Sequence, residues 1–211
     1  MNFKIAILDY GSGNIQSVKN IINYIGYDCE IIHNIDLKFD MYILPGVGSF
    51  DSAIKKLKKN NMYNYLCEFP DNKYLIGICL GMQLLCNQSE EGNEKGLGLI
   101  NADVKKFNNL SLRVPNMGWR DVNFTDDFSQ KLGVDQVSRY YFVHSYYVSL
   151  QNSIDEIGST EYGVKFTSAL NRDNIYGFQF HPEKSHQYGI RLLKHVIEFC
   201  NEQKNNTNPN N

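Results

Sequence analysis

The sequence feature that most constrains the fold is an apolar run that leads into a cysteine flanked by glycines. Tyr74 to Ile78 has the length and composition of a buried strand, and the segment from Leu80 to Cys86 is compatible with a helix. A sharp turn between them needs residues without bulk, and Gly77 and Gly81 lie two positions on either side of Cys79. We therefore predict a strand, a tight turn that carries Cys79, and a helix.

The predicted place of Cys79 at the start of a helix makes it the candidate nucleophile of the chain. Free backbone N–H groups and the helix dipole favour a thiolate at such a place, whereas a buried cysteine without this setting is usually an inert apolar residue. The chain has five cysteines and no CxxC pair, which argues against a disulfide framework and a zinc ribbon. The other four, Cys29, Cys67, Cys86 and Cys200, are expected to be reduced thiols.

The rest of the first half predicts a parallel sheet covered by helices. Its apolar runs are continuous rather than alternating, which is typical of strands buried on both faces. The expected strands are residues 3–8, 29–33, 41–44 and 74–78, and the expected helices are 14–25, 50–57 and 62–68. The second half is richer in strands, at 102–107, 139–150, 163–169 and 175–180, before an amphipathic helix over 185–200. We expect an α/β fold with antiparallel strands added in the C-terminal half.

Length and charge limit the classes of protein that the chain can represent. A chain of 211 residues can form one α/β domain, which we expect over residues 1–200, and the polar stretch 201–211 is expected to be a disordered tail. The net charge of −2 and the scattered basic residues indicate no nucleic-acid partner. No leader pattern and no apolar segment of membrane-spanning length is present, so we expect no membrane association and a cytoplasmic location.

A cysteine nucleophile needs a base with an acidic neighbour, and one segment near the C-terminus offers both. An apolar strand ends at His181, and residues two apart in extended chain project to the same side, so Glu183 can reach the imidazole. Pro182 between them stiffens this spacing. The carboxylate would hold the imidazole tautomer and stabilise the imidazolium during proton transfer. A histidine at a strand end can instead be an ordinary hydrogen-bonding residue, but the two motifs together favour a triad.

Acyl chemistry at Cys79 also needs donors for an oxyanion. The N–H of Leu80 is the natural first donor, and a second can come from the glycine-rich turn over residues 44–50, although in isolation this segment is equally a plain strand-to-helix turn. The five histidines form no pair with metal-ligand spacing, so we expect no metal and no cofactor. The glycines within residues 9–14 match neither the dinucleotide nor the Walker pattern, which argues against nucleotide binding.

With these motifs in order, the chain resembles the class I (triad-type) glutamine amidotransferases, whose fold is flavodoxin-like. Within them it resembles the glutaminase subunits of imidazole glycerol phosphate synthase. The matching segments are residues 9–14, 44–50, 77–85, 115–119, 141–147 and 179–185. The resemblance implies that Cys79, His181 and Glu183 hydrolyse glutamine through a glutamyl thioester, and that ammonia passes to a (β/α)₈-barrel cyclase subunit as heterodimer partner in histidine biosynthesis.

The same resemblance assigns further residues. It implies an oxyanion hole at Leu80 and Val47. The residues implied to hold glutamine are Gly46, Gly48, Gln83, His144, Ser145 and Tyr146. Those implied to face the partner are Asn14, Met117, Trp119, Tyr141 and Lys184, with core packing as the competing role of Trp119 and Tyr141.

Two departures and two alternatives accompany the resemblance. Asn116 and Arg120 flank the Met-Gly-Trp segment where the family is expected to have other side chains, which points to an altered partner surface. A related glutaminase could supply ammonia to a sugar-amidation step in surface glycan synthesis, and a protein of another class would be an inactive binding subunit. The intact triad argues against the inactive subunit.

Overall fold

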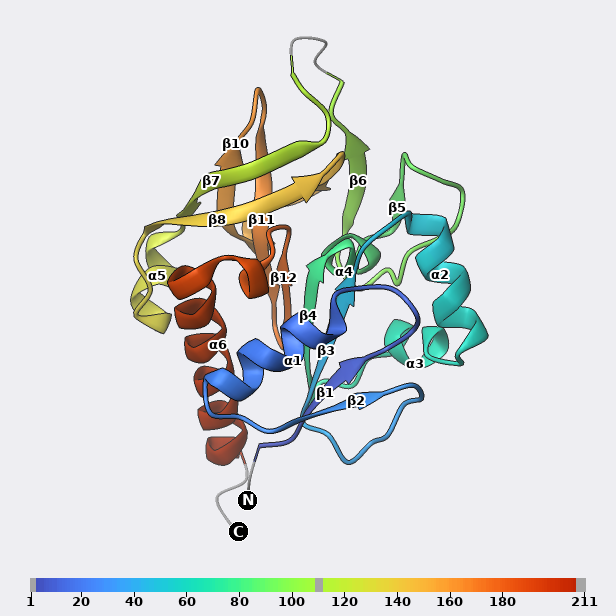
Figure 1. Cartoon of the computed structure of the whole chain (residues 1–211), viewed down its shortest axis with the longest axis vertical. Helices are drawn as coiled ribbons and strands as arrows, with labels where there is room; N and C mark the ends of the chain where they lie inside the picture. The colour runs from blue at the N-terminus through green and yellow to red at the C-terminus, as the bar shows by residue number, and fades with distance from the viewer. Residues whose placement is uncertain (1–2, 109–111, 208–211) are drawn as a thin grey trace.

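The structure is a computed structural model that describes residues 3–108 and 112–207. Five parallel strands form its centre (Figure 1). In spatial order they are β2 (Cys29–Ile32), β1 (Ile5–Leu8), β3 (Met41–Gly46), β4 (Tyr74–Cys79) and β12 (Ile175–Phe178). This order is that of a flavodoxin-like sheet, in which ligands bind outside the carboxyl ends of the strands. The class of fold predicted from the sequence is confirmed.

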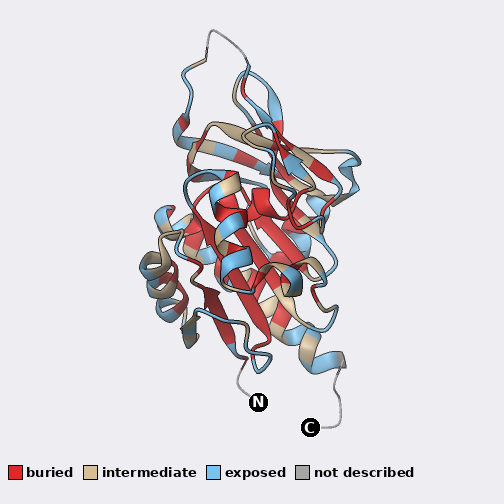
Figure 2. Cartoon of the chain, turned by 90° about the vertical axis from the view of Figure 1, so that its right-hand side faces the viewer, coloured by how far each residue is buried: buried red, intermediate tan, exposed pale blue. Residues whose placement is uncertain are grey.

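Helices cover both faces of this sheet because successive residues of each central strand point to opposite sides. Ile5 and Ile7 belong to one apolar cluster and Ala6 and Leu8 to the other. The first cluster packs against α1 (Ile15–Tyr24) and α6 (His186–Thr207). The second packs against α2 (Phe50–Lys59), α3 (Tyr63–Cys67) and α4 (Leu80–Leu84). Figure 2 shows the central strands as a buried layer between them.

An antiparallel extension continues the sheet beyond β12. It runs through β11 (Lys165–Arg172), β10 (Glu156–Glu161) and β7 (Asn116–Phe124) to β8 (Val137–His144). A branch leaves β11 through β9 (Tyr146–Leu150) to β6 (Ala102–Lys106) and β5 (Gln88–Ser89). The remaining elements are α5 (Asp126–Leu132) and two short 3₁₀ helices, η1 (Ser153–Asp155) and η2 (Pro182–Lys184). Helix α5 is capped at its N-terminus by Thr125, whose hydroxyl accepts from the Phe128 N–H, and at its C-terminus by Gly133 with φ +63°.

The structure departs from the expected strand over residues 139–150, which is two strands. The chain bends at Ser145, and β8 pairs with β7 whereas β9 pairs with β6 and β11. The bend carries residues of the candidate site. The sequence conceals it because apolar residues continue on both sides of Ser145. The sequence pattern also missed β7, β10 and α5, because these segments carry many polar residues.

The predicted disordered tail over residues 201–211 is wrong for its first seven residues. Helix α6 continues to Thr207 instead of ending near residue 200. Lys204 reaches Asp40 with an Nζ to Oδ1 distance of 2.8 Å and lies over the Phe3 ring, so contacts with the segments that lead into β3 and β1 support this polar end of the helix. Residues 208–211 lie outside the described part of the chain.

No helix within 3–108 and 112–207 combines the length and apolarity needed to cross a membrane. In the same ranges, no three His, Cys, Asp or Glu side chains are grouped so that they could hold a metal ion.

Candidate active site

Cys79 lies on the predicted turn, at the end of β4 and directly before α4. Its φ is +54°, a left-handed conformation that is unusual for a residue with a side chain and typical of strained functional turns. The turn is possible because the flanking glycines lack a Cβ: one on Gly81 would lie 1.8 Å from the Leu44 carbonyl oxygen, and one on Gly77 would lie 2.8 Å from the Gly81 carbonyl. Helix α4 has only five residues, so its dipole adds less to a thiolate than a long helix would.

His181 and Glu183 form the expected pair beside this cysteine. The Nδ1 of His181 donates to Oε1 of Glu183 at 2.8 Å, and both side chains are only 2% exposed. The backbone holds the pair in place, because the His181 N–H donates to the Tyr141 carbonyl and the Ser185 hydroxyl donates to the His181 carbonyl. Because the carboxylate binds Nδ1, Nε2 is the ring nitrogen that is left to exchange a proton, as a triad requires.

The charge on this histidine is stabilised although the ring is buried. Burial alone lowers the pKa of His181, but the Cys79 sulfur and the Glu183 carboxylate together outweigh it and raise the pKa to about 10. Nε2 is buried and has no hydrogen-bond partner within the described residues. An imidazolium in this position favours the thiolate of Cys79.

The sulfur itself has two weak polar contacts that point to its surroundings. Its thiol donates to the Val143 carbonyl at 3.9 Å, and the Gln179 amide nitrogen donates to the sulfur at 3.9 Å. Gln179 in turn accepts from Nε2 of Gln83 at 3.0 Å. The nucleophile is thus connected to the helix behind it through a buried pair of amides.

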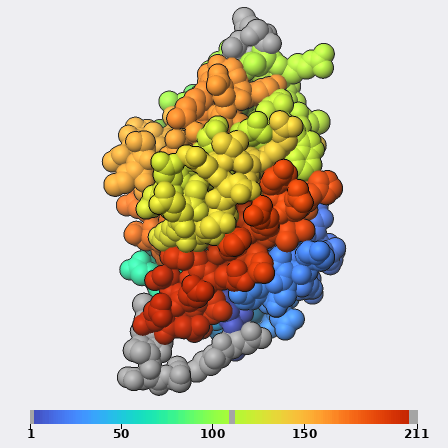
Figure 3. Space-filling model, turned by 90° about the vertical axis from the view of Figure 1, so that its left-hand side faces the viewer, coloured from blue at the N-terminus to red at the C-terminus, as the bar shows by residue number. Residues whose placement is uncertain are grey.

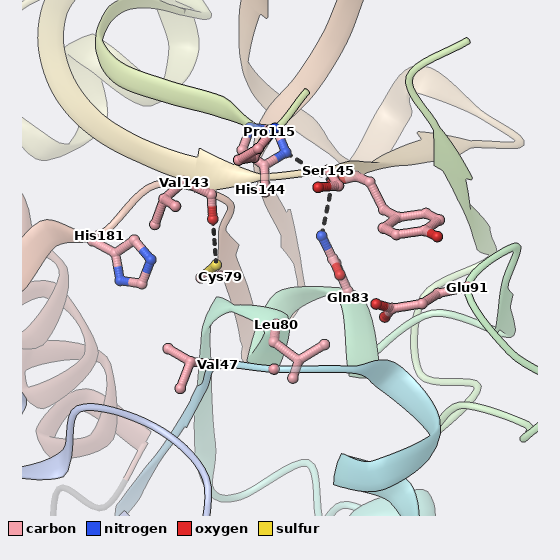
Figure 4. A pocket seen from close by; sticks show the side chains of 12 residues that line it. Val47, Cys79, Leu80, Gln83, Glu91, Pro115, Val143, His144, Ser145 and His181 are labelled. Carbon is pink, nitrogen blue, oxygen red and sulfur yellow. Dashed lines mark hydrogen bonds between the residues drawn. The ribbon is translucent and has the colours of Figure 1, made fainter. Parts of the chain in front are cut away.

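A cavity of about 300 Å³ opens at Cys79 and His181. Figure 4 shows the thiol between His181 and Gln83, with Val47 and Leu80 on one side and Val143 and His144 on the other. Five of the six residues predicted to hold glutamine line this cavity: Gly48, Gln83, His144, Ser145 and Tyr146. The sixth, Gly46, does not line it. Gly46 is buried at the end of β3, where an added Cβ would lie 2.7 Å from the Tyr10 hydroxyl.

The two residues predicted for the oxyanion hole lie at the cavity. Leu80 is the first residue of α4, so its N–H has no partner within the helix. Val47 lies on the turn after β3 and is 45% exposed, and its carbonyl accepts from the Ser12 hydroxyl. Their role toward an oxyanion stays a prediction.

His144 is a neutral residue of the cavity wall. Its ring is buried among Phe107, Phe142 and Phe166, and burial lowers its pKa to about 4. Nδ1 donates to the Tyr146 carbonyl at 2.8 Å, because a carbonyl can only accept. His144 therefore shapes the wall and does not serve as a second base.

Four of the five residues predicted to face a partner lie close to the triad. Trp119 and Tyr141 oppose each other on β7 and β8, with ring centroids 6.2 Å apart, and Lys184 lies in η2 next to Glu183. Met117 is 57% exposed and Trp119 36% exposed, and Trp119 stacks on His186 at 5.5 Å. Figure 3 shows β7, β8, α6 and α1 adjoining on one face.

Asn14 lies immediately before α1. Residues of α1 and η2 line a common groove of about 380 Å³ that extends from this face. Because Met117 and Trp119 are exposed, contact with a partner is favoured over core packing for these two residues.

The sequence did not single out two polar side chains of the site. Glu91 lines the cavity and accepts from the Phe50 N–H with Oε2 at 2.7 Å. Gln179 is fully buried beside the thiol. Glu91 comes from a polar loop, where a carboxylate is unremarkable without the fold. Gln179 is a polar residue within the apolar run that leads to His181, and this was the available signal.

Comparison with known proteins agrees with this geometry. A sequence model of the family described as glutamine amidotransferase class-I matches residues 6–198. Among solved structures, a glutamine amidotransferase superposes with a TM-score of 0.73 at 17% identity, covering 93% of this chain and 98% of that chain. PurLQS from Thermotoga maritima superposes with a TM-score of 0.70 at 15% identity, covering 94% and 99%. These structures share the fold.

The chain therefore belongs to the class I glutamine amidotransferases and is an enzyme of that class. The imidazole glycerol phosphate synthase subunit HisH 2 of Methanococcus maripaludis is 47% identical over 199 residues, which cover 92% of this chain and 98% of that protein. The HisH subunit of Leptospira borgpetersenii is 42% identical over 198 residues, covering 90% and 97%. Within the class, the chain belongs to the family of the imidazole glycerol phosphate synthase subunit HisH.

Proposed function

We propose that this chain hydrolyses glutamine through Cys79, His181 and Glu183 and passes the ammonia to a (β/α)₈-barrel cyclase subunit in histidine biosynthesis. The observation that carries the proposal is the buried 2.8 Å bond between His181 and Glu183 beside a nucleophile elbow that opens on a cavity. The relatives named as subunits of imidazole glycerol phosphate synthase support the pathway and the need for a partner. Free thiols at all five cysteines support a cytoplasmic location.

The reaction follows from the protonation states of the pair. His181 accepts the Cys79 proton, and the thiolate attacks the side-chain carbonyl carbon of glutamine. The tetrahedral intermediate collapses with cleavage of the C–N bond, and the imidazolium gives its proton to the leaving nitrogen, which departs as ammonia. Water then attacks the thioester while His181 accepts one of its protons. Cys79 leaves as the thiol and glutamate is released.

The Leu80 N–H and the Val47 turn would stabilise the oxyanion in both halves of this reaction. Gly48, Gln83, Ser145 and Tyr146 would surround the substrate. His144 would contribute to the wall without exchanging protons, since its pKa of about 4 keeps it neutral at physiological pH. Gly46 would support the site indirectly, because its missing side chain allows β3 to approach Tyr10 and Leu80 closely.

Glu91 is expected to recognise the α-ammonium group of glutamine. It is an acidic residue of the cavity lining, and a carboxylate complements this cation. Glu91→Gln keeps an oxygen for the Phe50 N–H but removes the charge, so KM for glutamine should rise about tenfold or more while kcat changes little. Steady-state kinetics of glutamate release check this. Glu90→Gln is the matched control, because Glu90 bonds the Lys106 N–H and does not line the cavity; an equal rise in KM for both variants would contradict the assignment.

The exposed pair Met117 and Trp119 is proposed as the centre of the docking face, with Asn14, Tyr141 and Lys184 around it. An exposed tryptophan at the centre of an interface often contributes about 2 kcal/mol or more, so Trp119→Ala should weaken binding to the purified cyclase barrel at least about tenfold. Isothermal titration and glutamate release in the presence of the barrel measure this. Ile154→Ala is the control, since Ile154 is also exposed but lies in η1. Equal binding by both variants would remove Trp119 from the face.

The destination of the ammonia is tested by complementation of a bacterium that lacks its own HisH subunit. Growth without histidine, dependent on co-expression of the barrel subunit, is the expected result. Failure to grow, together with glutamate release stimulated by a sugar-pathway barrel, would instead favour ammonia supply to sugar amidation. Absence of glutamine hydrolysis with either partner would indicate the inactive binding subunit.

A further inference from the structure

We propose that Arg120 is a positioning residue for the glutamine pocket, which it supports through Asn116 and His144. The inference rests on the proposed function of the cavity at Cys79. It concerns a chain of hydrogen bonds that runs from strand β7, behind the proposed docking face, to the carbonyl of Tyr146 at the pocket wall.

The alternation of β7 separates two roles on one strand. Met117 and Trp119 are exposed, whereas Asn116 is fully buried. Arg120 lies four residues after Asn116 on the same strand. Residues two and four apart in a strand share a face, so Asn116 and Arg120 point together toward the pocket side. Nε of Arg120 donates to Oδ1 of Asn116 at 3.2 Å.

This first bond determines the orientation of the next two groups. Because Arg120 can only donate, the Asn116 oxygen faces Arg120 and its amide nitrogen faces Nε2 of His144, at 3.0 Å. Nε2 must then accept, which leaves the proton on Nδ1. Nδ1 donates to the Tyr146 carbonyl at 2.8 Å, and every donor in the chain meets an acceptor. One tautomer of His144 therefore satisfies all of these partners.

The Tyr146 carbonyl is where this chain meets the nucleophile helix. Nε2 of Gln83 also donates to it, at 2.9 Å, and Gln83 is linked through Gln179 to the sulfur of Cys79. The pocket wall at Ser145 and Tyr146 is thus held from one side by α4 and from the other by β7. Loss of the His144 bond would leave Gln83 as the only described side-chain donor to this carbonyl.

Arg120 is held where it can perform this role. Its guanidinium lies 4.8 Å from the centroid of the Tyr162 ring, and Nη1 donates to the Trp119 carbonyl at 3.1 Å. If the Nε–H donor is lost, the Asn116 amide is free to turn and present its oxygen to His144. The histidine would then carry its proton on Nε2 and release the Tyr146 carbonyl.

Two substitutions isolate the single N–H that the proposal requires. Arg120→Gln places an amide nitrogen at the same position along the side chain as Nε, whereas Arg120→Met places a methyl group there. Both remove the charge, the contact with Tyr162 and the bond to Trp119. Only the methionine variant removes the donor to Asn116, so the comparison between the two isolates the hydrogen bond from the rest of the side chain.

The first measurement is the ¹⁵N spectrum of the ring nitrogens in histidine-labelled protein, with His144 assigned through the His144→Asn variant. We expect the Nδ1–H tautomer in the wild type and in Arg120→Gln, and its loss in Arg120→Met. The second is covalent labelling of Cys79 by a glutamine-analogue electrophile, which separates the binding constant KI from the maximal rate. KI should rise about fivefold to tenfold in Arg120→Met, with less than a twofold change in Arg120→Gln and in the maximal rate of either.

Several outcomes overturn the proposal. They are an Nε2–H tautomer in the wild type, an unchanged His144 signal or KI in Arg120→Met, and equal losses in the two variants. Asn116→Leu should reproduce the effects of Arg120→Met and replaces it if that variant does not fold. Arg139→Met, which removes an exposed arginine on β8 paired with Asp121, should leave both measurements unchanged. Failure of the proposed function is distinct, because Cys79 would then not react with the analogue even in the wild type.

Discussion

Cys79→Ala is expected to lower the kcat of glutamine hydrolysis by at least about 10⁴-fold, because no other described thiol lies beside His181 and Glu183. Alanine keeps the backbone of the elbow but leaves no atom that can form the thioester. Glutamate release in the presence of saturating barrel partner measures the loss. Cys67→Ala, which removes a half-buried thiol of α3, is the control and should retain full activity. Turnover retained in Cys79→Ala would refute the triad.

The environments of the other thiols sharpen this prediction. Burial raises the pKa of Cys29 to about 11 and that of Cys200 to about 12, and it also raises the pKa values of Cys67 and Cys86. These four groups are therefore protonated and weakly nucleophilic at pH 8. A glutamine-analogue electrophile should attach one equivalent per chain, at Cys79, as peptide mass spectrometry can verify. Labelling chiefly at another cysteine would contradict the elbow assignment.

The central sheet and the arrangement of His181 and Glu183 beside Cys79 were predictable because strong local patterns encode them. β1, β3 and β4 are continuous apolar runs, which few structures other than buried parallel strands can accommodate. The glycines around Cys79 and the spacing of His181 and Glu183 impose geometry over a few residues. Each of these features depends on neighbours in the chain, and each was visible without the fold.

The antiparallel extension was not predictable in the same way. β7 carries Asn116, Arg120 and Asp121, and its polar side chains are stabilised by partners distant in the sequence, such as His144. The end of α6 is similar, because Lys204 depends on Asp40 for its ion pair. Tertiary contacts override the local preference in both places, and no single segment contains that information.

Glu183→Gln is expected to lower kcat by about 10³-fold to 10⁴-fold, because a turned amide can donate its N–H to Nδ1 and hold the wrong tautomer of His181, and because the amide carries no charge to stabilise the imidazolium. Glu183 is buried with His181, so its carboxylate acts with little screening by solvent. The matched control is Glu198→Gln, which removes the same charge from an exposed pair on α6 and should leave kcat unchanged. A loss below tenfold for Glu183→Gln would refute the orienting role.

The same substitution should change how the labelling rate of Cys79 and the Tm depend on pH, because it lowers the pKa of His181. Its folded pKa of about 10 exceeds the ordinary value of 6.5, so the charged ring stabilises the fold fully below about pH 6.5 and this contribution is lost as the pH rises toward 10. Burial lowers the pKa of His181, and without the carboxylate only the Cys79 sulfur still opposes it, so the pKa falls. The labelling rate of Cys79 should therefore decline at a lower pH in Glu183→Gln than in the wild type, and Tm should fall less between pH 7 and pH 10. Parallel profiles for the two proteins would show that Glu183 does not stabilise the imidazolium.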